Sequence, residues 1–331
     1  MRIVVDGMGG DYAPKAVVEG VVQAVKEFNV DVTLVGIQEK LEAELKSYNY
    51  PKEKIQIIHA PEVVGMDEHA TVSLRKKKDS SMTVGVRLLK DKNYDAFISA
   101  GNTGAVVAAS TIYLGMLEGV ERPAIGLVIP TVKGLSFLID VGANADPKPQ
   151  HLLQSAQMAH VYVRELLGRE KPTIGLLNIG EEEGKGTDFH KETYKLMEEK
   201  LSNFIGNVEA SEVFSGKSDC IICDGFVGNV VLKVSEGVLE SAGKLLKQEI
   251  KKSPLALTGA LLMRRGLNHI KKLADYSEYG GAPLLGVNGL VMISHGRSSA
   301  KAIKNAIKAT KREVEQNILT HMMTEVKRIA L

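Results

Sequence analysis

Aromatic residues are scarce in this sequence: they make up 5% of its 331 residues, and tryptophan is absent. Proteins that bind single-stranded nucleic acid stack the bases on aromatic side chains. The formal net charge is only +2, so the chain also lacks the strongly basic surface that attracts a nucleic-acid backbone. We therefore expect no binding to nucleic acid.

Long hydrophobic runs and cysteines are also few. No apolar stretch approaches the ~20 residues of a membrane-spanning helix. The N-terminal residues MRIVVDGMGGD predict a strand that ends in a glycine turn, not a signal peptide. The only cysteines, Cys220 and Cys223, lie in one apolar run, and residues three apart on a strand point to opposite faces. We expect two buried thiols rather than a metal site or disulfide, in a cytoplasmic protein.

Several catalytic signatures are missing. The sequence has no G-x-S-x-G elbow, no H-E-x-x-H motif and no G-x-G-x-x-G fingerprint after a strand. Its eight histidines are scattered and form no ligand-spaced pair. No covalent nucleophile stands out, and neither a metal nor a cofactor is predicted. The pattern favours a reaction in which the attacking anion comes from solution.

Strand-like runs of valine, isoleucine and leucine alternate with helical patterns along the whole chain. This order predicts an α/β fold with a mainly parallel sheet covered by helices on both faces. No linker-like stretch divides the chain, so residues 1–331 are expected to form one continuous unit with a helical elaboration near 227–275. The expected strands are 2–6, 32–36, 55–60, 95–100, 124–130, 135–142, 173–180, 219–225 and 291–296, the fifth and sixth forming an antiparallel pair, with a last helix running to the C-terminus.

Six of these strands end in glycines accompanied by polar side chains. In an open parallel sheet, ligands bind beyond the carboxyl ends of the strands, and N–H groups at helix starts bind anions. A single loop of this kind is an ordinary turn after a strand, but six together predict a shared binding crevice. The loops are DGMGGD (6–11), SAGNTGA (99–105), DVGANAD (140–146), IGEEEGKGTD (179–188), FVGN (226–229) and SHGRS (294–298).

The stretch NIGEEEGKGTD differs from a Walker A loop, which follows the pattern G-x-x-x-x-G-K-[ST]. Three glutamates lie between Gly180 and Gly184, and Gly186 separates Lys185 from Thr187. Three carboxylates beside a triphosphate would repel it, so this loop does not predict a nucleotide site.

The motifs DGMGGD, SAGNTGA, DVGAN, NIGEEEGKGTD, CDGFVGN, GGAPLLGVNG and SHGRS follow one another in the order seen in the PlsX family, which the sequence resembles from Met1 to its final helix. The resemblance implies a three-layer α/β sandwich similar to isocitrate and isopropylmalate dehydrogenases and to phosphotransacetylases, assembled as a homodimer. It also implies a reaction in which acyl-acyl-carrier-protein (acyl-ACP) and inorganic phosphate give acyl phosphate and free ACP. A membrane glycerol-3-phosphate acyltransferase would use the acyl phosphate in phospholipid synthesis. The ligand of the Lys185 loop would then be a single orthophosphate.

Such a reaction requires positioning of phosphate and stabilisation of an oxyanion, because phosphate is already nucleophilic and a thiolate is a good leaving group. Lys185 is the candidate for holding phosphate, with a solvated loop lysine as the alternative. Asn229 is the candidate donor to the thioester oxygen, with a helix N-cap as the alternative. The remaining candidates for substrate binding are Asp6, Gly9, Gly10, Ser99, Gly101, Asn102, Thr103, Asn144, Gly184, Gly186, Thr187, Asp224 and Gly228, of which the aspartates are expected to orient loops. His295 and Arg297 are expected to close the crevice.

Two basic segments are candidate docking sites for ACP, which is a small acidic protein. One is residues 75–78, which could equally be a solvated face. The other lies in residues 253–273, where apolar residues recur at helical spacing, further leucines add apolar surface beyond that one stripe, and basic residues follow. That make-up suits a helix at a membrane surface and equally a helix buried in a core or dimer. Its candidate ACP or membrane contacts are Leu257, Leu261, Arg264, Arg265, Lys271 and Lys272.

Three other functions compete with acyl transfer from ACP. A decarboxylating dehydrogenase on the same fold would need clustered aspartates for a metal and a nicotinamide site, which the sequence does not show. A phosphotransacetylase acting on short acyl-CoA would use the same loops. A non-catalytic membrane scaffold would leave the Lys185 loop without a role.

Overall fold

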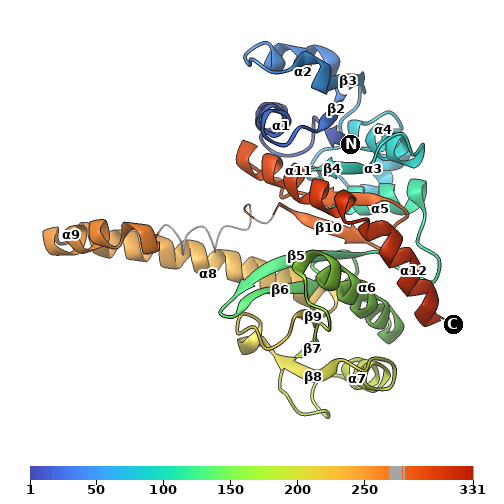
Figure 1. Cartoon of the computed structure of the whole chain (residues 1–331), viewed down its shortest axis with the longest axis vertical. Coiled ribbons are helices and arrows are strands. Elements are labelled where there is room, and N and C mark those ends of the chain that lie inside the picture. Colours follow the sequence, from blue (N-terminus) through green and yellow to red (C-terminus); the bar gives the residue numbers. More distant parts are fainter. Residues whose placement is uncertain (268–277, 279, 331) are drawn as a thin grey trace.

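The computed structural model describes residues 1–267, 278 and 280–330. Within this part of the chain, eleven strands form one sheet in the order β3-β2-β1-β4-β11-β10-β5-β6-β9-β7-β8. Helices pack against both faces of the sheet, and one long helix, α8, projects from the body (Figure 1). The expected α/β fold is confirmed.

The N-terminal half of the sheet contains five strands that run in the same direction. Ile3 and Val5 of β1 pack with α1 and α11 on one face, whereas Val4 packs with α4 and α5 on the other. Burial on both faces explains why these strands are continuously apolar. The elements are β1 (Arg2–Asp6), α1 (Lys15–Phe28), β2 (Asp31–Gly36), α2 (Gln38–Leu45), β3 (Ile55–His59), α3 (Ala70–Lys76), α4 (Ser81–Lys90), β4 (Ala96–Ser99), α5 (Thr103–Leu114), β11 (Leu290–Ile293) and α11 (Ala300–Glu315).

The other half contains four strands that are parallel to one another. Cys220 packs with α6 on one face, and Cys223 belongs to the core beneath α8 on the other. Both thiols are buried and free, so the prediction of two separate core cysteines is confirmed. The elements are β6 (Gly134–Ile139), α6 (Pro149–Leu167), β7 (Ile174–Asn178), α7 (Asp188–Lys200), β8 (Phe204–Glu209), β9 (Cys220–Ile222), α8 (Gly225–Lys251) and α12 (Ile318–Ala330).

The two halves are joined by antiparallel pairings in the middle of the sheet. Strand β5 (Ala124–Thr131) pairs antiparallel with β6, as expected for the hairpin, and also with β10 (Ala282–Leu285), which is antiparallel to β11. The two halves therefore run in opposite directions, and the sheet is mainly rather than wholly parallel.

Three local predictions are wrong. Strands β8 and β10 were not expected, because β8 contains Gly206 and Asn207 and β10 is a four-residue strand with Pro283. Arg75 and Lys76 belong to α3, although the charged stretch RKKKDSS after the third expected strand predicts a loop. The single C-terminal helix is two helices, because Asn317 adopts a left-handed conformation with φ 51° between α11 and α12.

Helix α8 and the shorter α9 (Pro254–Leu262) form an arm that extends from the body, with α9 at its far end (Figure 1). This confirms the expected helical elaboration as far as residue 267, whereas residues 268–275 of the predicted range lie outside the described part of the chain. Val234, Val238 and Leu245 on α8 are 58%, 60% and 60% exposed. Leu257 and Leu261 on α9 are exposed as well, so within this chain α9 is not a core helix.

One carboxyl group is fully buried away from the loops. Glu313 on α11 accepts a hydrogen bond of 2.8 Å from the Tyr162 hydroxyl on α6. Burial raises the pKa of Glu313 to about 8, although the bond from Tyr162 opposes the shift. This site makes stability depend on pH near neutrality.

Candidate functional site

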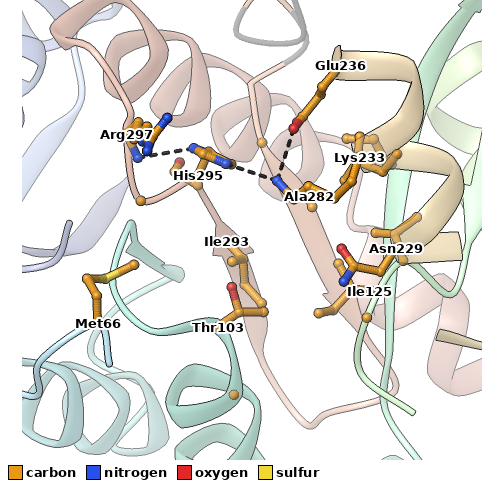
Figure 2. Close-up of a pocket in the computed structure, with 18 of the residues that line it drawn as sticks. Met66, Thr103, Ile125, Asn229, Lys233, Glu236, Ala282, Ile293, His295 and Arg297 are labelled. Carbon is orange, nitrogen blue, oxygen red and sulfur yellow. Dashed lines mark hydrogen bonds and ion pairs between the residues drawn. The ribbon is translucent and has the colours of Figure 1, made fainter. Parts of the chain in front are cut away.

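A cavity of about 380 Å³ lies where the loops of both halves of the sheet meet (Figure 2). The loops after β1, β4 and β11 contribute Asp11, Thr103 and His295 to its lining. The loop after β6 contributes Gly142, and α8 contributes Asn229. The prediction that strand-end loops from distant parts of the sequence share a crevice is thus confirmed for these loops.

The start of α5 forms one wall. Asn102 caps the helix by accepting a bond of 3.0 Å from the backbone N–H of Ala105, and its amide donates to the carbonyls of Met66 and Glu68. Its amide group is thus used to tie this turn to the loop before α3. Thr103, the next residue, lines the cavity directly. The N-terminal end of a helix carries partial positive charge, so this wall favours an anion.

The start of α8 forms the opposite wall. Asp224 caps this helix by accepting a bond of 2.8 Å from the N–H of Val227, so the N-cap alternative for Asn229 is wrong. Gly228 permits close packing, because a Cβ there would lie 1.8 Å from the carbonyl oxygen of Asp140. Asn229 lies one turn into the helix, and Lys233 follows four residues later on the same face. Both side chains line the cavity (Figure 2).

A charged row links α8 to the loop after β11. Lys233 Nζ lies 3.0 Å from Glu236 Oε2 and 3.2 Å from His295 Nε2. His295 Nδ1 accepts a bond of 3.1 Å from the Arg297 N–H, so Nε2 carries the hydrogen in the neutral ring and faces the Lys233 ammonium. Burial lowers the pKa of His295, and the charges of Lys233 and Arg297 lower it further. Two donors that meet at one cavity wall suit an anionic ligand.

The rest of the lining is largely apolar. Ile125, Leu127 and Val141 come from β5 and the end of β6, and Leu232 comes from α8. Ser294 also lies in the wall, and its buried hydroxyl has no hydrogen-bond partner among the described residues. The cavity thus sets an apolar wall beside several cationic and donor groups.

The loop after β1 is held by buried polar contacts. Asp6 accepts bonds of 3.1 Å from the Met8 N–H and 2.8 Å from the Ser99 hydroxyl. Burial raises the pKa of Asp6, and these donors oppose the shift. Gly10 has φ +100°, and a Cβ there would lie 2.9 Å from the carbonyl of Gly296 in the loop after β11. These residues shape the loops around the cavity and do not line it, and the same holds for Gly9 and Gly101.

Asp140, which was not among the expected site residues, organises the loop after β6. Its carboxylate accepts bonds from the backbone N–H groups of Ile125, Gly142, Ala143 and Asn144. Burial raises the pKa of this carboxyl, and the four donors oppose the shift. The Asn144 amide also donates to Asp140 and to the carbonyl of Pro123, so this side chain is held within the loop.

The Lys185 loop lies outside the cavity lining, as do Gly184, Gly186 and Thr187. Lys185 Nζ lies 3.8 Å from Glu182 Oε2, so a neighbouring glutamate forms only a long, exposed ion pair with this lysine. The loop follows β7, which is separated from β6 only by β9, so its strand end lies roughly 10 Å from that of β6. Thr187 contacts His190 at 2.9 Å rather than capping α7.

Sequence reasoning missed Lys233 and Glu236, although a signal was present. In FVGNVVLKVSE, Asn229, Lys233 and Glu236 recur at spacings of four and three, which place them on one face of a helix. His295 and Arg297 were expected near the crevice, and both line the cavity. Lys271 and Lys272 fall outside the described residues.

The described residues contain no group of three or more His, Cys, Asp or Glu side chains arranged to hold a metal ion. In the same part of the chain, no helix is both long and apolar enough to cross a membrane.

Comparison with known proteins gives the family. The family model described as "Fatty acid synthesis protein" matches residues 1–321. A phosphate acyltransferase from Alkaliphilus oremlandii is 48% identical over 322 residues, which cover 97% of this chain and 96% of that protein. A phosphate acyltransferase from Dictyoglomus turgidum is 49% identical over 320 residues, which cover 96% and 95% of the two chains.

Solved structures agree on the fold. A phosphotransacetylase from Streptococcus pyogenes superimposes with a TM-score of 0.63 at 18% identity, covering 95% of this chain and 94% of that chain. A 4-hydroxythreonine-4-phosphate dehydrogenase from Klebsiella pneumoniae gives a TM-score of 0.55 at 12% identity, with coverage of 95% and 99%. At these identities the likeness concerns the fold alone, and it confirms the phosphotransacetylase-like architecture. By its sequence relatives, the chain belongs to the fatty acid synthesis protein family, also called the PlsX family, together with these phosphate acyltransferases.

Proposed function

We propose that this enzyme transfers a fatty acyl group from acyl-ACP to inorganic phosphate, giving acyl phosphate and free ACP. Family membership makes the chain an acyltransferase with phosphate as the acceptor. The observation that carries the finer proposal is a single cavity that combines an anion-attracting wall with an apolar wall. Phosphate requires the first of these walls, and a fatty acyl thioester requires the second.

In this proposal, phosphate binds between the start of α5 and the charged row on α8. Thr103 and the N-terminal end of α5 offer donors and partial positive charge. Lys233 Nζ and His295 Nε2 add two further donors on the opposite side. Arg297, whose Nε lies 3.9 Å from Asp11, supplies another cation at the rim. These groups would replace the water that solvates a phosphate dianion.

Lys185 remains a proposed phosphate contact, but on the opposite side of the phosphate from Lys233. Its side chain is 48% exposed and is paired only loosely with Glu182, so it is free to reorient toward a ligand between the two loops. In this arrangement Lys185 would approach phosphate from the β7 side and Lys233 from the α8 side. Gly184 and Gly186 would then present backbone N–H groups beside it.

The proposed chemistry is direct attack without a covalent enzyme intermediate. A phosphate oxygen bonds to the thioester carbonyl carbon, the carbonyl oxygen becomes an oxyanion, and the carbon–sulfur bond then breaks to release the ACP thiolate. Asn229 is proposed to donate its side-chain N–H to the oxyanion. Cys220 and Cys223 lie in the core, and burial raises the pKa of both thiols well above the usual range, so neither is suited to act as a nucleophile.

We infer ACP docking on a basic surface beside the arm. Lys77 pairs with Glu68 at 2.5 Å and donates to the Val63 carbonyl, so this member of the 75–78 cluster is turned inward. Arg264 and Arg265 are exposed next to α9. The α9 end of the arm is therefore the better supported of the two candidate surfaces.

The arm also supports a homodimer and a membrane contact. We propose that Val234, Val238 and Leu245, which share one exposed face of α8, pack against a second copy of the chain. Leu257 and Leu261 at the tip are proposed to enter the headgroup region of the cell membrane at its inner face. Because acyl phosphate is labile and amphipathic, such contact would favour hand-over to a membrane glycerol-3-phosphate acyltransferase.

The reaction is tested by mixing the protein with palmitoyl-ACP, with and without phosphate. Free ACP thiol is followed while hydroxylamine traps acyl phosphate. Phosphate-dependent thiol release with trapped product is expected. Thiol release without phosphate would indicate a thioesterase, and release only from acyl-CoA would indicate a phosphotransacetylase. No release from either donor would favour a scaffold.

A further inference from the structure

A second cavity of about 380 Å³ opens directly from the first. The two cavities share five lining residues, namely Leu127, Leu232, Glu236, His295 and Arg297. The second cavity is a groove between α8 and the β5–β6 hairpin.

The groove runs away from Asn229 along both of its walls. On β5 the lining proceeds from Leu127 to Ile129 and Pro130, and on α8 it proceeds from Leu232 through Ser235 to Leu239. From Asn229 to Leu239 the helix advances about 15 Å at 1.5 Å per residue. A zigzag chain of C–C bonds of ~1.5 Å advances roughly 1.25 Å per carbon, so about twelve carbons would span this length.

The lining has the chemistry of a lipid chain site. Val231, Phe214 and the β5 side chains are apolar, and its carboxylates are paired elsewhere. Glu236 lies 3.0 Å from Lys233, and Glu240 lies 2.5 Å from Lys244. Pockets that bind small ligands are mostly apolar with a few polar groups at one end, and here those groups lie at the junction with the first cavity.

We propose that this groove binds the hydrocarbon tail of the acyl donor, with the thioester carbonyl at the Asn229 end. The inference rests on the proposed function and adds the position of the chain. Each methylene that leaves water strengthens binding by about fourfold, equivalent to about 0.8 kcal/mol. The enzyme should therefore favour long chains, and the groove should set that preference.

The test fills the groove and measures chain-length selectivity. Ser235 lies midway along the groove, is partly exposed, and donates a hydrogen bond to the Val231 carbonyl of its own helix. Ser235→Phe is compared with Ser235→Ala, which removes the hydroxyl without filling the groove. The kcat/KM is measured with octanoyl-, lauroyl- and palmitoyl-ACP at saturating phosphate.

We expect Ser235→Phe to lower kcat/KM for palmitoyl-ACP relative to octanoyl-ACP by at least tenfold, while Ser235→Ala keeps the parent ratio. Leu239→Asp, which places a carboxylate at the far end of the groove on a half-exposed position, should penalise palmitoyl-ACP but spare octanoyl-ACP. The proposal would be overturned if Ser235→Phe and Leu239→Asp both kept the parent ratio of kcat/KM values, or if they lowered kcat/KM equally for all three donors. If these variants changed the oligomeric mass measured by light scattering but kept the parent ratio of kcat/KM values, the groove would instead be a contact with a second copy of the chain. Failure of the parent protein with every donor would instead refute the proposed function.

Discussion

Replacing Lys233 by methionine tests the proposed phosphate site without altering the rest of the cavity. Methionine keeps most of the side-chain volume but removes the ammonium that lies 3.2 Å from His295 and 3.0 Å from Glu236. Glu236 is 26% exposed and can be solvated after the change, so the fold should be little affected. The loss should therefore concern ligand binding.

The size of the effect follows from the exposure of Lys233. A hydrogen bond to a charged group contributes about 1.5–3 kcal/mol. Because the Lys233 side chain is 52% exposed, water screens the interaction, and the lower end of that range applies. About 1.5 kcal/mol corresponds to a rise of roughly tenfold in the KM for phosphate. The KM for acyl-ACP should change much less.

The assay is the dependence of ACP thiol release on phosphate concentration. Lys244→Met is the matched control, because Lys244 lies on the same helix, pairs with Glu240 at the surface and does not line the cavity. A second readout is the titration of His295 by NMR. Since the Lys233 charge helps to lower the pKa of His295, that pKa should rise in Lys233→Met. A folded Lys233→Met enzyme with the parent KM for phosphate would refute this placement.

Four further predictions concern other parts of the molecule. Lys185→Ala should reduce turnover with circular dichroism unchanged, and near-parent activity would remove Lys185 from the phosphate site. Asn229→Ala should lower kcat by ~10²–10³ with little change in the KM for phosphate, because it removes one oxyanion donor; an effect on KM alone would contradict that role. Glu313 binds its proton more tightly in the folded state, with a pKa of about 8 against 4.5, so stability is full below pH 4.5 and falls as the pH rises toward 8. Glu313→Gln should remove that loss and stabilise the protein by about 3 kcal/mol at pH 7, which urea unfolding at pH 5 and 7 would test; equal effects at both values would count against it. Leu257→Ala combined with Leu261→Ala should reduce flotation with anionic liposomes, and parent-like flotation would exclude the α9 contact.

The sequence was sufficient to locate most strand ends, because most of the buried strands are continuous apolar runs that stop at a glycine. It also selected Thr103 and Asn229 as candidates, and both line one cavity. The rule that the carboxyl ends of parallel strands share one edge does not explain why they meet, because β4 and β9 lie in halves of the sheet that run in opposite directions. The opposite direction of the two halves was not predictable, because it depends on β10. That strand has four residues, includes Pro283, and has no apolar run long enough to distinguish it from a loop.

Side-chain roles within the loops were harder to predict than the loops themselves. Lys185 was selected because the residues around it resemble a phosphate loop. Its distance from the cavity, however, depends on the place of β7 in the sheet, which the neighbouring residues do not reveal. An N-cap role for Asn229 was considered because the sequence did not show that α8 begins several residues earlier. Asp224 caps α8 instead, and this shift of five residues moves Asn229 onto the cavity-facing side. The register of α8 thus decided which residues face the cavity.

That register also explains how one helix could position both substrates. Asn229, Lys233 and Glu236 lie on one face of α8, and Leu232, Ser235 and Leu239 lie on the adjacent face that lines the groove. The two sets are interleaved along a single rigid element, so a phosphate beside Lys233 and an acyl chain beside Leu239 would be held at a fixed separation, with Asn229 where they meet. Direct transfer depends on such positioning more than on any acid or base. A substitution that shifts α8, such as Gly228→Ala against the Asp140 carbonyl, should therefore impair phosphate and acyl-chain recognition together.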